Sequence, residues 1–317
     1  MSSADVSSSS RPRSRRRKFL LLAVMIVVAS AIAWRLSRPT ILVGRAWPAA
    51  EHVAISDVSH QGWDELLRRY VDADGFVDYT GWKQSPEDVR RLDEYLATLS
   101  RVDDARDATA KQRLAFWINA YNAVTVRGIV REYPTTSIQN HVARVWGYNI
   151  WRDLKLIVGD RRFSLGEIEH AVLRKMNEPR IHFAIVCASR GCPRLLNEAF
   201  SAERLEEQLS RNTLAFFADP TKCSVDAERR ELRLSPILNW FAADFEASTP
   251  AVLQRIANWL PEPAQAVAQS KDVRVTYLDY DWSLNDQATA GPPLPPFLKR
   301  ETPDESQRSD RHHSGAQ

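Results

Sequence analysis

The chain has 317 residues, of which 44% are apolar and 26% are charged, and this composition is sufficient for one sizeable hydrophobic core. It excludes a wholly disordered chain, collagen and a small disulfide-rich protein. Only eleven glycines are present, which disfavours an all-β fold with many tight turns and favours a helix-rich α+β fold.

The formal net charge is +3, but the positive charge is concentrated at the amino terminus. Residues 1–18 contain six basic side chains and one acidic side chain, so the rest of the chain is slightly acidic. Because little basic surface remains to neutralise phosphates, nucleic acid is excluded as a partner.

Residues 19–34 are an apolar run that follows this basic segment and is interrupted only by Ser30. Charge followed by a hydrophobic run is typical of a signal peptide or a signal anchor. We expect residues 1–18 to be cytoplasmic and the protein to cross a bacterial inner membrane once, with its domain on the periplasmic side. Small residues between Ala29 and Ala33 leave a second possibility open, secretion after signal cleavage.

The rest of the chain divides into three parts. Residues 35–56 read as a linker, and residues 57–286 as a single domain. Residues 287–317 contain four closely spaced prolines and then a polar tail, which predicts disorder.

Hydrophobic periodicity predicts several helices in the first half of the domain. Apolar residues recur at helical spacing over 63–70 and over 89–99, the second run following a Ser85-Pro86-Glu87 start. Residues 111–133 are apolar on most faces, which predicts a central buried helix that ends at Pro134.

Strand patterns are concentrated in the second half. Residues 154–158 and 161–163 flank Gly159-Asp160 and predict a hairpin, after which Ser164 and Glu167 fit a capping box at a helix start. The apolar run 181–186 predicts a buried strand, 223–234 a second hairpin and 273–278 another strand. With helices over 202–217 and 236–245, the pattern predicts helices around a small, mainly antiparallel sheet.

Reactive side chains gather near the end of the predicted buried strand. Cys187 ends it, Cys192 follows five residues later, and His170 and His182 lie just upstream. Cys192 precedes Pro193, so we expect it at a helix N-cap, where helix-start amides and nearby arginines would favour a thiolate.

The partner of Cys187 follows from strand geometry. His182 and Cys187 have opposite parity, so on a regular strand they would face opposite sides of the sheet. His170 is then the better partner, with Glu169 beside it as a residue able to orient the imidazole.

Other readings of these residues remain open. A cysteine at a strand end, such as Cys187, is more often a small buried apolar residue than a nucleophile. An oxidising compartment also allows a disulfide between Cys192 and either Cys187 or Cys223. The spacing fits no compact zinc site, so we expect no metal and no cofactor. Asn119 lies three residues before Asn122 on the buried helix, and such an amide either ties a loop to the helix or orients a catalytic histidine.

Several segments together resemble one uncharacterised family. They are Ala115–Ala123, Ser164-Leu165 with Ile168–His170, Arg180–Ala184 leading into Cys187–Ser189, and Cys192-Pro193. Gly75–Tyr79 and Tyr280–Asn285 resemble the two ends of the same family, the one known as domain of unknown function 547. The resemblance covers roughly residues 57–286.

The resemblance implies a papain-like or transglutaminase-like cysteine hydrolase with rearranged catalytic elements. On that reading Cys187 attacks an acyl carbonyl, His170 moves the proton, Glu169 orients it, and Asn119 or backbone amides near Ser189 stabilise the oxyanion. The expected activity is hydrolysis of amide bonds in peptide or cell-wall material. The alternative is a non-catalytic envelope scaffold or a domain that binds a protein partner.

Overall fold

The computed structural model describes residues 13–36, 40–143, 147–246 and 248–289. Residues 1–12 of the predicted basic segment and 290–317 of the predicted tail therefore lie outside the described residues. At the start of that tail, Gln287–Thr289 form a short 3₁₀ helix, η9.

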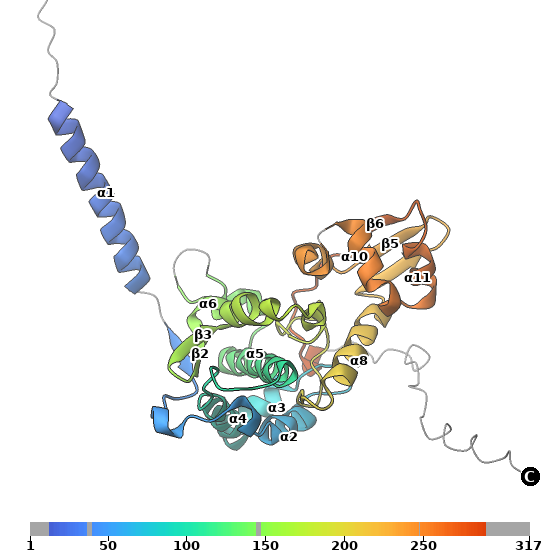
Figure 1. The fold of residues 1–317 in the computed structure, drawn as a ribbon, viewed down its shortest axis with the longest axis horizontal. Helices are drawn as coiled ribbons and strands as arrows, with labels where there is room; N and C mark the ends of the chain where they lie inside the picture. The colour runs from blue at the N-terminus through green and yellow to red at the C-terminus, as the bar shows by residue number, and fades with distance from the viewer. Residues whose placement is uncertain (1–12, 37–39, 144–146, 247, 290–317) are drawn as a thin grey trace, which may run out of the picture.

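The larger part of the fold is helical and is built around one long helix, α5 (Ala110–Glu132), which agrees with the predicted central helix. A Thr109–Gln112 capping box starts α5, and from Leu114 to Val130 every residue except Arg127 is buried. Helices α2 (Gln61–Tyr70), α3 (Tyr79–Gln84) and α4 (Pro86–Leu99) pack in the same region, with α3 and α4 directly against α5. Figure 1 shows α5 in the middle of this helical part.

The first sheet has the order β1–β2–β3 and covers another side of α5. The predicted hairpin is present as β2 (Leu154–Val158) and β3 (Arg161–Ser164), which pair antiparallel. Strand β1 (Ile41–Val43) pairs parallel with β2, Ile41 standing opposite Leu154. Strand β1 lies inside the predicted linker, and its Val43 packs in the core, as does Ile55. Part of residues 35–56 therefore belongs to the folded domain.

The second sheet has the order β4–β5–β6 and forms a separate core. Strands β4 (Cys223–Asp226) and β5 (Glu231–Leu234) make the predicted hairpin, and β6 (Arg274–Tyr277) joins β5 in parallel. Each sheet thus has one antiparallel and one parallel pair, so the expectation of one mainly antiparallel sheet is corrected to two small mixed sheets. The α+β class is confirmed.

Three more helices, which with the second sheet make up the second part of the fold, and a set of short elements complete the described chain. The helices are α8 (Leu205–Ala218), α10 (Thr249–Ile256) and α11 (Glu262–Ala268). The predicted helix over 236–245 is present as two short pieces, α9 (Ile237–Trp240) and η7 (Ala242–Phe245). The remaining short elements are η1 (Ala49–Glu51), η2 (Ile55–Asp57), η3 (Ile138–His141), α6 (Ile150–Asp153) and η8 (Ala257–Trp259).

The helix predicted after Ser164 changes pitch twice. The Ser164–Glu167 capping box is present and starts α7 (Leu165–Glu167). A π-helical turn, η4 (Ile168–Val172), and a 3₁₀ turn, η5 (Leu173–Met176), follow without a break. A π turn widens the helix by one residue, and such turns occur often at functional sites.

The buried strand predicted over 181–186 is wrong. Residues Pro179–Phe183 form a 3₁₀ helix, η6, because Pro179 favours a helix start and the Glu178 side chain accepts from the Arg180 N–H. The chain then runs to residue 204 without regular secondary structure. A short apolar run of this kind does not by itself distinguish a buried strand from a buried turn.

Helix α1 (Arg13–Leu36) includes the predicted signal segment, and its apolar side chains from Phe19 to Val28 are exposed to solvent. In Figure 1 it stands apart from the packed part of the chain. Within the described residues, no helix combines the length and the apolar character needed to cross a membrane.

Candidate active site

One cavity of about 260 Å³ collects all five residues that the sequence nominates for catalysis: Glu169, His170, His182, Cys187 and Cys192. It lies where elements of the first core meet α9 of the second. Its wall is apolar and largely aromatic, formed by Tyr121, Trp151, Ile185, Ile237, Trp240, Phe241, Tyr280 and Trp282. Nucleophile and base candidates at the wall of an apolar hollow are typical of a ligand or catalytic site.

The chain that carries Cys187 is held by one buried side chain of α5. The Asn122 amide donates to the Ala184 carbonyl at 3.0 Å and accepts from the Val186 N–H at 2.9 Å. Asn122 therefore satisfies the backbone carbonyl and N–H groups that would otherwise pair with a neighbouring strand. Because no strand exists here, the parity argument fails, and His182 and Cys187 line the same cavity.

The residues after Cys187 are fixed by a second segment, 281–285. The N–H groups of Arg190 and Gly191 donate to the carbonyls of Ser283 and Asp281, at 2.9 Å and 2.8 Å. Ala188 adopts a left-handed backbone with φ of 59°, which is costly for a residue other than glycine. The resulting turn places the side chains of Cys187 and Ser189 together, with Sγ and Oγ 3.1 Å apart.

The two thiols share one hydroxyl group. The Tyr280 hydroxyl lies 3.2 Å from Cys192 Sγ and 3.4 Å from Cys187 Sγ, and Ser189 Oγ donates to it at 3.0 Å. Cys192 Sγ also accepts from the Cys187 backbone N–H at 3.0 Å. All three cysteines are free, so neither disulfide considered from the sequence is present.

Negative charge on this pair is favoured at Cys192. Burial opposes its ionisation, but hydrogen bonds from Cys187, Ser189 and Tyr280 outweigh burial and lower the pKa of Cys192 to about 6. The pKa of Cys187 is raised, first by its hydrogen bond to Cys192 and then by burial. Cys192 was predicted to gain its acidity from a helix N-cap. That is wrong, because the next helix after Pro193 is α8 and begins at Leu205.

His182 belongs to a charged cluster that was not predicted from the sequence. Its Nε2 lies 2.7 Å from Asp244 Oδ2, and Arg174 binds both oxygens of the same carboxylate, at 2.6 Å and 2.9 Å. The ring stacks on Phe241 with centroids 4.1 Å apart. Burial lowers the pKa of His182 to about 4 despite Asp244, so the ring is neutral at pH 7.

His170 and Glu169 lie on the π turn η4, next to each other at the cavity wall. The Arg174 guanidinium donates to His170 Nδ1 at 3.2 Å, so a neutral ring carries its proton on Nε2. Glu169 accepts from the Tyr121 hydroxyl at 3.1 Å, and burial raises the pKa of its carboxyl group. No hydrogen bond between described residues joins His170 to Glu169 or to either thiol.

Asn119, the predicted oxyanion residue, does not line the cavity. Its amide donates to the Phe200 carbonyl at 2.8 Å and accepts from the Phe200 N–H at 2.9 Å. It ties the loop after Cys192 to α5, which is the structural alternative considered from the sequence.

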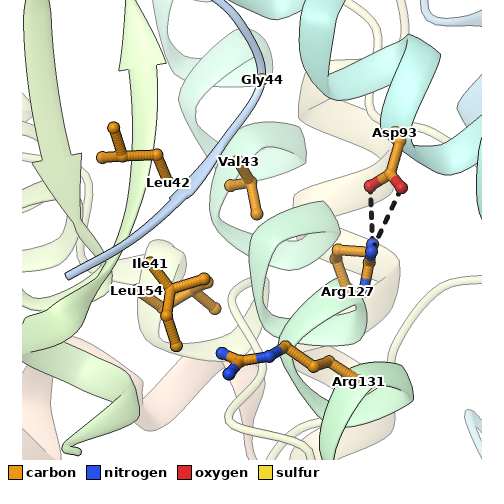
Figure 2. Close-up of a pocket in the computed structure, with 8 residues that line it drawn as sticks. All are labelled: Ile41, Leu42, Val43, Gly44, Asp93, Arg127, Arg131 and Leu154. Carbon is orange, nitrogen blue, oxygen red and sulfur yellow. Dashed lines mark hydrogen bonds and ion pairs between the residues drawn. The ribbon is translucent and has the colours of Figure 1, made fainter. Parts of the chain in front are cut away.

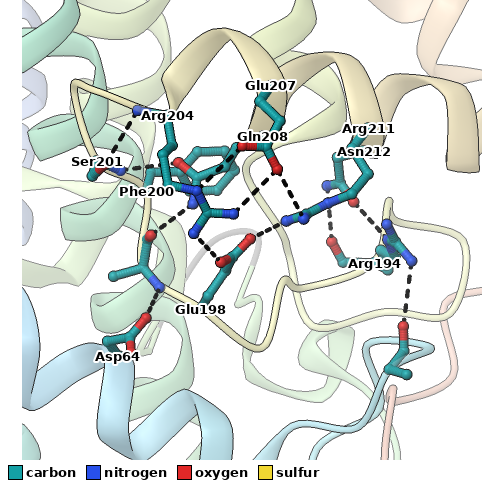
Figure 3. Close-up of polar contacts among 12 residues, drawn as sticks. Asp64, Arg194, Glu198, Phe200, Ser201, Arg204, Glu207, Gln208, Arg211 and Asn212 are labelled. Carbon is teal, nitrogen blue, oxygen red and sulfur yellow. Dashed lines mark hydrogen bonds and ion pairs between the residues drawn. The ribbon is translucent and has the colours of Figure 1, made fainter. Parts of the chain in front are cut away.

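The same loop is anchored to α8 by charged residues, as Figure 3 shows. Buried Glu198 pairs with both Arg204 and Arg211, and Arg194 Nε donates to Asn212 Oδ1 at 2.8 Å. These contacts fix the position of the loop that follows Cys192.

A second cavity, of about 340 Å³, lies beside β1 and differs in chemistry. Figure 2 shows Arg127 directed at Asp93, with which it forms two hydrogen bonds, and Arg131 beside Leu154. No histidine or cysteine lines it. In the described part of the chain, no group of three or more His, Cys, Asp and Glu residues is arranged to hold a metal ion.

Tyr280, Asp244 and Arg174 contribute to the site, and none of them was predicted from the sequence. Tyr280 starts the closing motif Tyr280–Asn285, so its motif was visible although its role was not. Asp244 had no local signal, because its partner His182 lies 62 positions away in the sequence.

Comparison with known proteins supports the resemblance to the uncharacterised family, over a shorter range than the residues 57–286 expected from the sequence. Residues 105–217 match the family described as "Protein of unknown function, DUF547". The matched range includes both cavity histidines, Glu169, Cys187 and Cys192, but neither Asp244 nor Tyr280. No curated protein and no solved structure matches the chain.

Proposed function

We propose that this chain, which carries a DUF547 region, is a thiol-dependent hydrolase that acts on amide bonds of peptide or cell-wall material. The observation that supports it is the cavity in which an acidic thiol, Cys192, lies among Cys187, His170 and His182. A thiolate is the reactive form of cysteine, and activated thiols with nearby imidazoles are the basis of acyl-transfer catalysis.

We assign a role to each residue from its protonation state and from its position at the cavity. The Cys192 thiolate attacks the carbonyl carbon of the amide, and the electron pair moves to the carbonyl oxygen. The imidazolium form of His170 delivers its Nε2 proton to the departing amine and is left as a neutral imidazole. The thioester that remains is cleaved by water, with the imidazole accepting the water's proton. We assign His182 and Asp244 as positioning residues that hold Arg174 against His170.

The assignment departs from the sequence-based roles at one point. The resemblance implies Cys187 as the nucleophile, whereas we propose Cys192, which is supported by the hydrogen bonds that its sulfur accepts. We also propose a papain-like arrangement of two lobes, supported by the position of the cavity between the two hydrophobic cores.

The experiment uses the purified full-length protein with peptide and cell-wall peptide amides. We expect a thioester on Cys192, detected by mass mapping and released by hydroxylamine. Cys192→Ser should abolish it, and His170→Ala should slow turnover by about 100-fold or more. Cys223→Ser is the matched control, because Cys223 packs in the second core and burial raises its pKa to about 12. Normal turnover by Cys192→Ser would refute the proposal.

We propose that the domain is anchored on the periplasmic side of a bacterial inner membrane through residues 19–34. The apolar side chains along α1 support this proposal, since the described residues leave them largely exposed. Fractionation of cells tests it. The full chain should stay with membranes after carbonate extraction and be digested by protease added to spheroplasts. A soluble, shortened periplasmic form would instead indicate secretion after cleavage.

A second candidate is a non-catalytic scaffold or partner-binding domain. It is favoured by one observation, that within the described chain no imidazole is hydrogen-bonded to a thiol. The half-exposed Trp240 at the cavity wall would then serve as a contact for a protein partner. Uniform inertness of the cysteines towards iodoacetamide would support this alternative.

A further inference from the structure

The thiol pair has a feature that amide hydrolysis does not need, namely a second sulfur beside the first. Cys187 Sγ and Cys192 Sγ both lie within hydrogen-bond range of the Tyr280 hydroxyl, at 3.4 Å and 3.2 Å. The Cys192 sulfur also lies 3.0 Å from the backbone nitrogen of Cys187. Two sulfurs so close in one turn can join by side-chain rotation and a small adjustment of the backbone.

The pair is also asymmetric and accessible. Cys192 accepts hydrogen bonds from a backbone N–H and from a hydroxyl, which stabilise a thiolate there. Cys187 is the more exposed of the two, and both line the cavity. Attack by one ionised thiol and completion by a neighbouring thiol is the arrangement that thiol–disulfide exchange requires.

We propose that Cys192 and Cys187 exchange with a small dialkyl disulfide and close into a reversible disulfide of their own. The Cys192 thiolate attacks one sulfur of the substrate disulfide, whose other sulfur leaves as a thiolate. Cys187 loses its proton to solvent and attacks Cys192 Sγ in the mixed disulfide, which releases the second thiolate. The protein is oxidised by two electrons and the substrate disulfide is reduced to two thiols.

The exchange activity is separable from the hydrolysis proposed above. Hydrolysis requires an attacking thiolate but no disulfide, so Cys187→Ser should lose disulfide closure whatever its amide turnover. Oxidation of the pair removes the attacking thiolate, so an oxidised protein should not hydrolyse amides until it is reduced. Exchange can therefore succeed even if hydrolysis is absent, and it can fail while hydrolysis is present.

The test uses the full-length protein and glutathione disulfide as the probe. Samples are equilibrated at a series of reduced-to-oxidised glutathione ratios, quenched in acid, alkylated and mapped by mass spectrometry. We expect a peptide in which Cys187 and Cys192 are joined with loss of two hydrogens, reversible on addition of excess thiol. Cys187→Ser should instead accumulate glutathione on Cys192.

Further variants and a rate comparison control for folding and for non-specific oxidation. Cys223→Ser should close the Cys187–Cys192 disulfide like the wild type. In the wild type, Cys192 should react at least about tenfold faster than Cys223. The proposal is overturned if the pair stays reduced at every ratio, or if folded Cys187→Ser, verified by circular dichroism, gains no glutathione. It is also overturned if Cys187 gains glutathione in the Cys192→Ser variant as fast as the pair closes in the wild type.

Discussion

At the scale of single residues, the acidity of Cys192 depends on a tyrosine hydroxyl far away in sequence. The thiolate is stabilised by the backbone N–H of Cys187 and by the side chains of Cys187, Ser189 and Tyr280, of which the Tyr280 hydroxyl comes from farthest away in the sequence. Removal of this hydroxyl leaves the backbone donor from Cys187 in place. The loss should therefore weaken the thiolate without eliminating it.

We predict that Tyr280→Phe raises the pKa of Cys192 and slows its alkylation at pH 7 by about tenfold. In the wild type the alkylation rate should be half-maximal near pH 6, the pKa of Cys192. Iodoacetamide labelling followed over pH 4 to 9 measures both. Tyr277→Phe is the control, since that exposed tyrosine lies outside the cavity and should leave the profile unchanged. An identical profile for Tyr280→Phe would rule out its role.

His182 should make the stability of the protein dependent on pH. In the folded protein burial holds its pKa at about 4, against 6.5 in the unfolded chain. Between these values only the unfolded chain binds the proton, so stability is full above pH 6.5 and falls as the pH is lowered to 4. The difference corresponds to about 3 kcal/mol.

We expect His182→Gln to reduce this pH dependence, as measured by urea unfolding between pH 4 and 7. His60→Gln should remove a comparable part, because burial also lowers the pKa of His60 to about 4. If His182→Gln keeps the full slope of the wild type, then His182 is protonated in the folded state and its assignment as a neutral ring is incorrect.

At the scale of elements, two asparagines on α5 make the same kind of contact with different consequences. Asn119 and Asn122 are equally buried, and each bonds both a backbone N–H and a carbonyl of a distant loop. Only the loop held by Asn122 leads directly into Cys187. Substitution at either position should therefore lower stability, but only substitution of Asn122 should also change the reactivity of the thiol.

We predict that Asn119→Ala and Asn122→Ala each cost about 2 to 4 kcal/mol, because each leaves two buried backbone groups without partners. Both should lower Tm by about 5 to 15 °C. Below that temperature, only Asn122→Ala should change the alkylation rate of Cys187. Equal effects of the two variants on Cys187 would contradict this view of Asn122.

The turn after Ala188 depends on the absence of a side chain at Gly191. A Cβ there would lie 2.8 Å from the Tyr280 ring and 2.9 Å from the Asp281 carbonyl oxygen. We predict that Gly191→Ala displaces Tyr280, raises the pKa of Cys192 and slows its labelling. Gly62→Ala is the matched control, because a Cβ at that helical position meets nothing and should stabilise by about 0.5 to 1 kcal/mol. Unchanged labelling by Gly191→Ala would contradict the prediction.

The sequence predicted correctly those elements that depend on contacts between residues close together in the chain. The hairpin around Gly159, the Ser164 capping box and the long buried helix all depend on neighbouring residues. The run 181–186 failed because its apolar residues are buried by a distant helix, with Asn122 rather than a strand satisfying the backbone. The five nominated residues do meet at one cavity, but their partners Tyr280 and Asp244 come from far along the chain. No local pattern reports such contacts.

At the scale of the whole molecule, one phenylalanine connects the site to the second core. Phe183 is fully buried next to His182 and packs against Phe216, Phe217 and Phe245, with ring centroids 4.8, 5.2 and 5.8 Å away. The 3₁₀ turn η6 thus places His182 at the cavity and Phe183 in the second core. Loss of packing in the second core should therefore disorder the residues that line the cavity.

We predict that Phe183→Ala costs about 3 to 5 kcal/mol and mainly affects the second core. Hydrogen exchange should show faster exchange in α8 and in β4–β6, with α5 still protected. The variant should also label Cys192 more slowly at pH 7 if the second part positions the Tyr280 end of the chain. Uniform loss of protection across both cores would instead show that the molecule unfolds as a single unit.

Within a single turn, Asn119, Tyr121 and Asn122 join helix α5 to three distant segments, namely the loop at Phe200, the π turn η4 and the chain entering Cys187. One inserted or deleted residue within this turn would rotate the remainder of the helix by about 100°. Asn119 and Asn122 could then no longer bond the loop at Phe200 and the chain entering Cys187 at the same time. Related sequences should accordingly vary in the length of their loops but keep a constant number of residues between these helix positions.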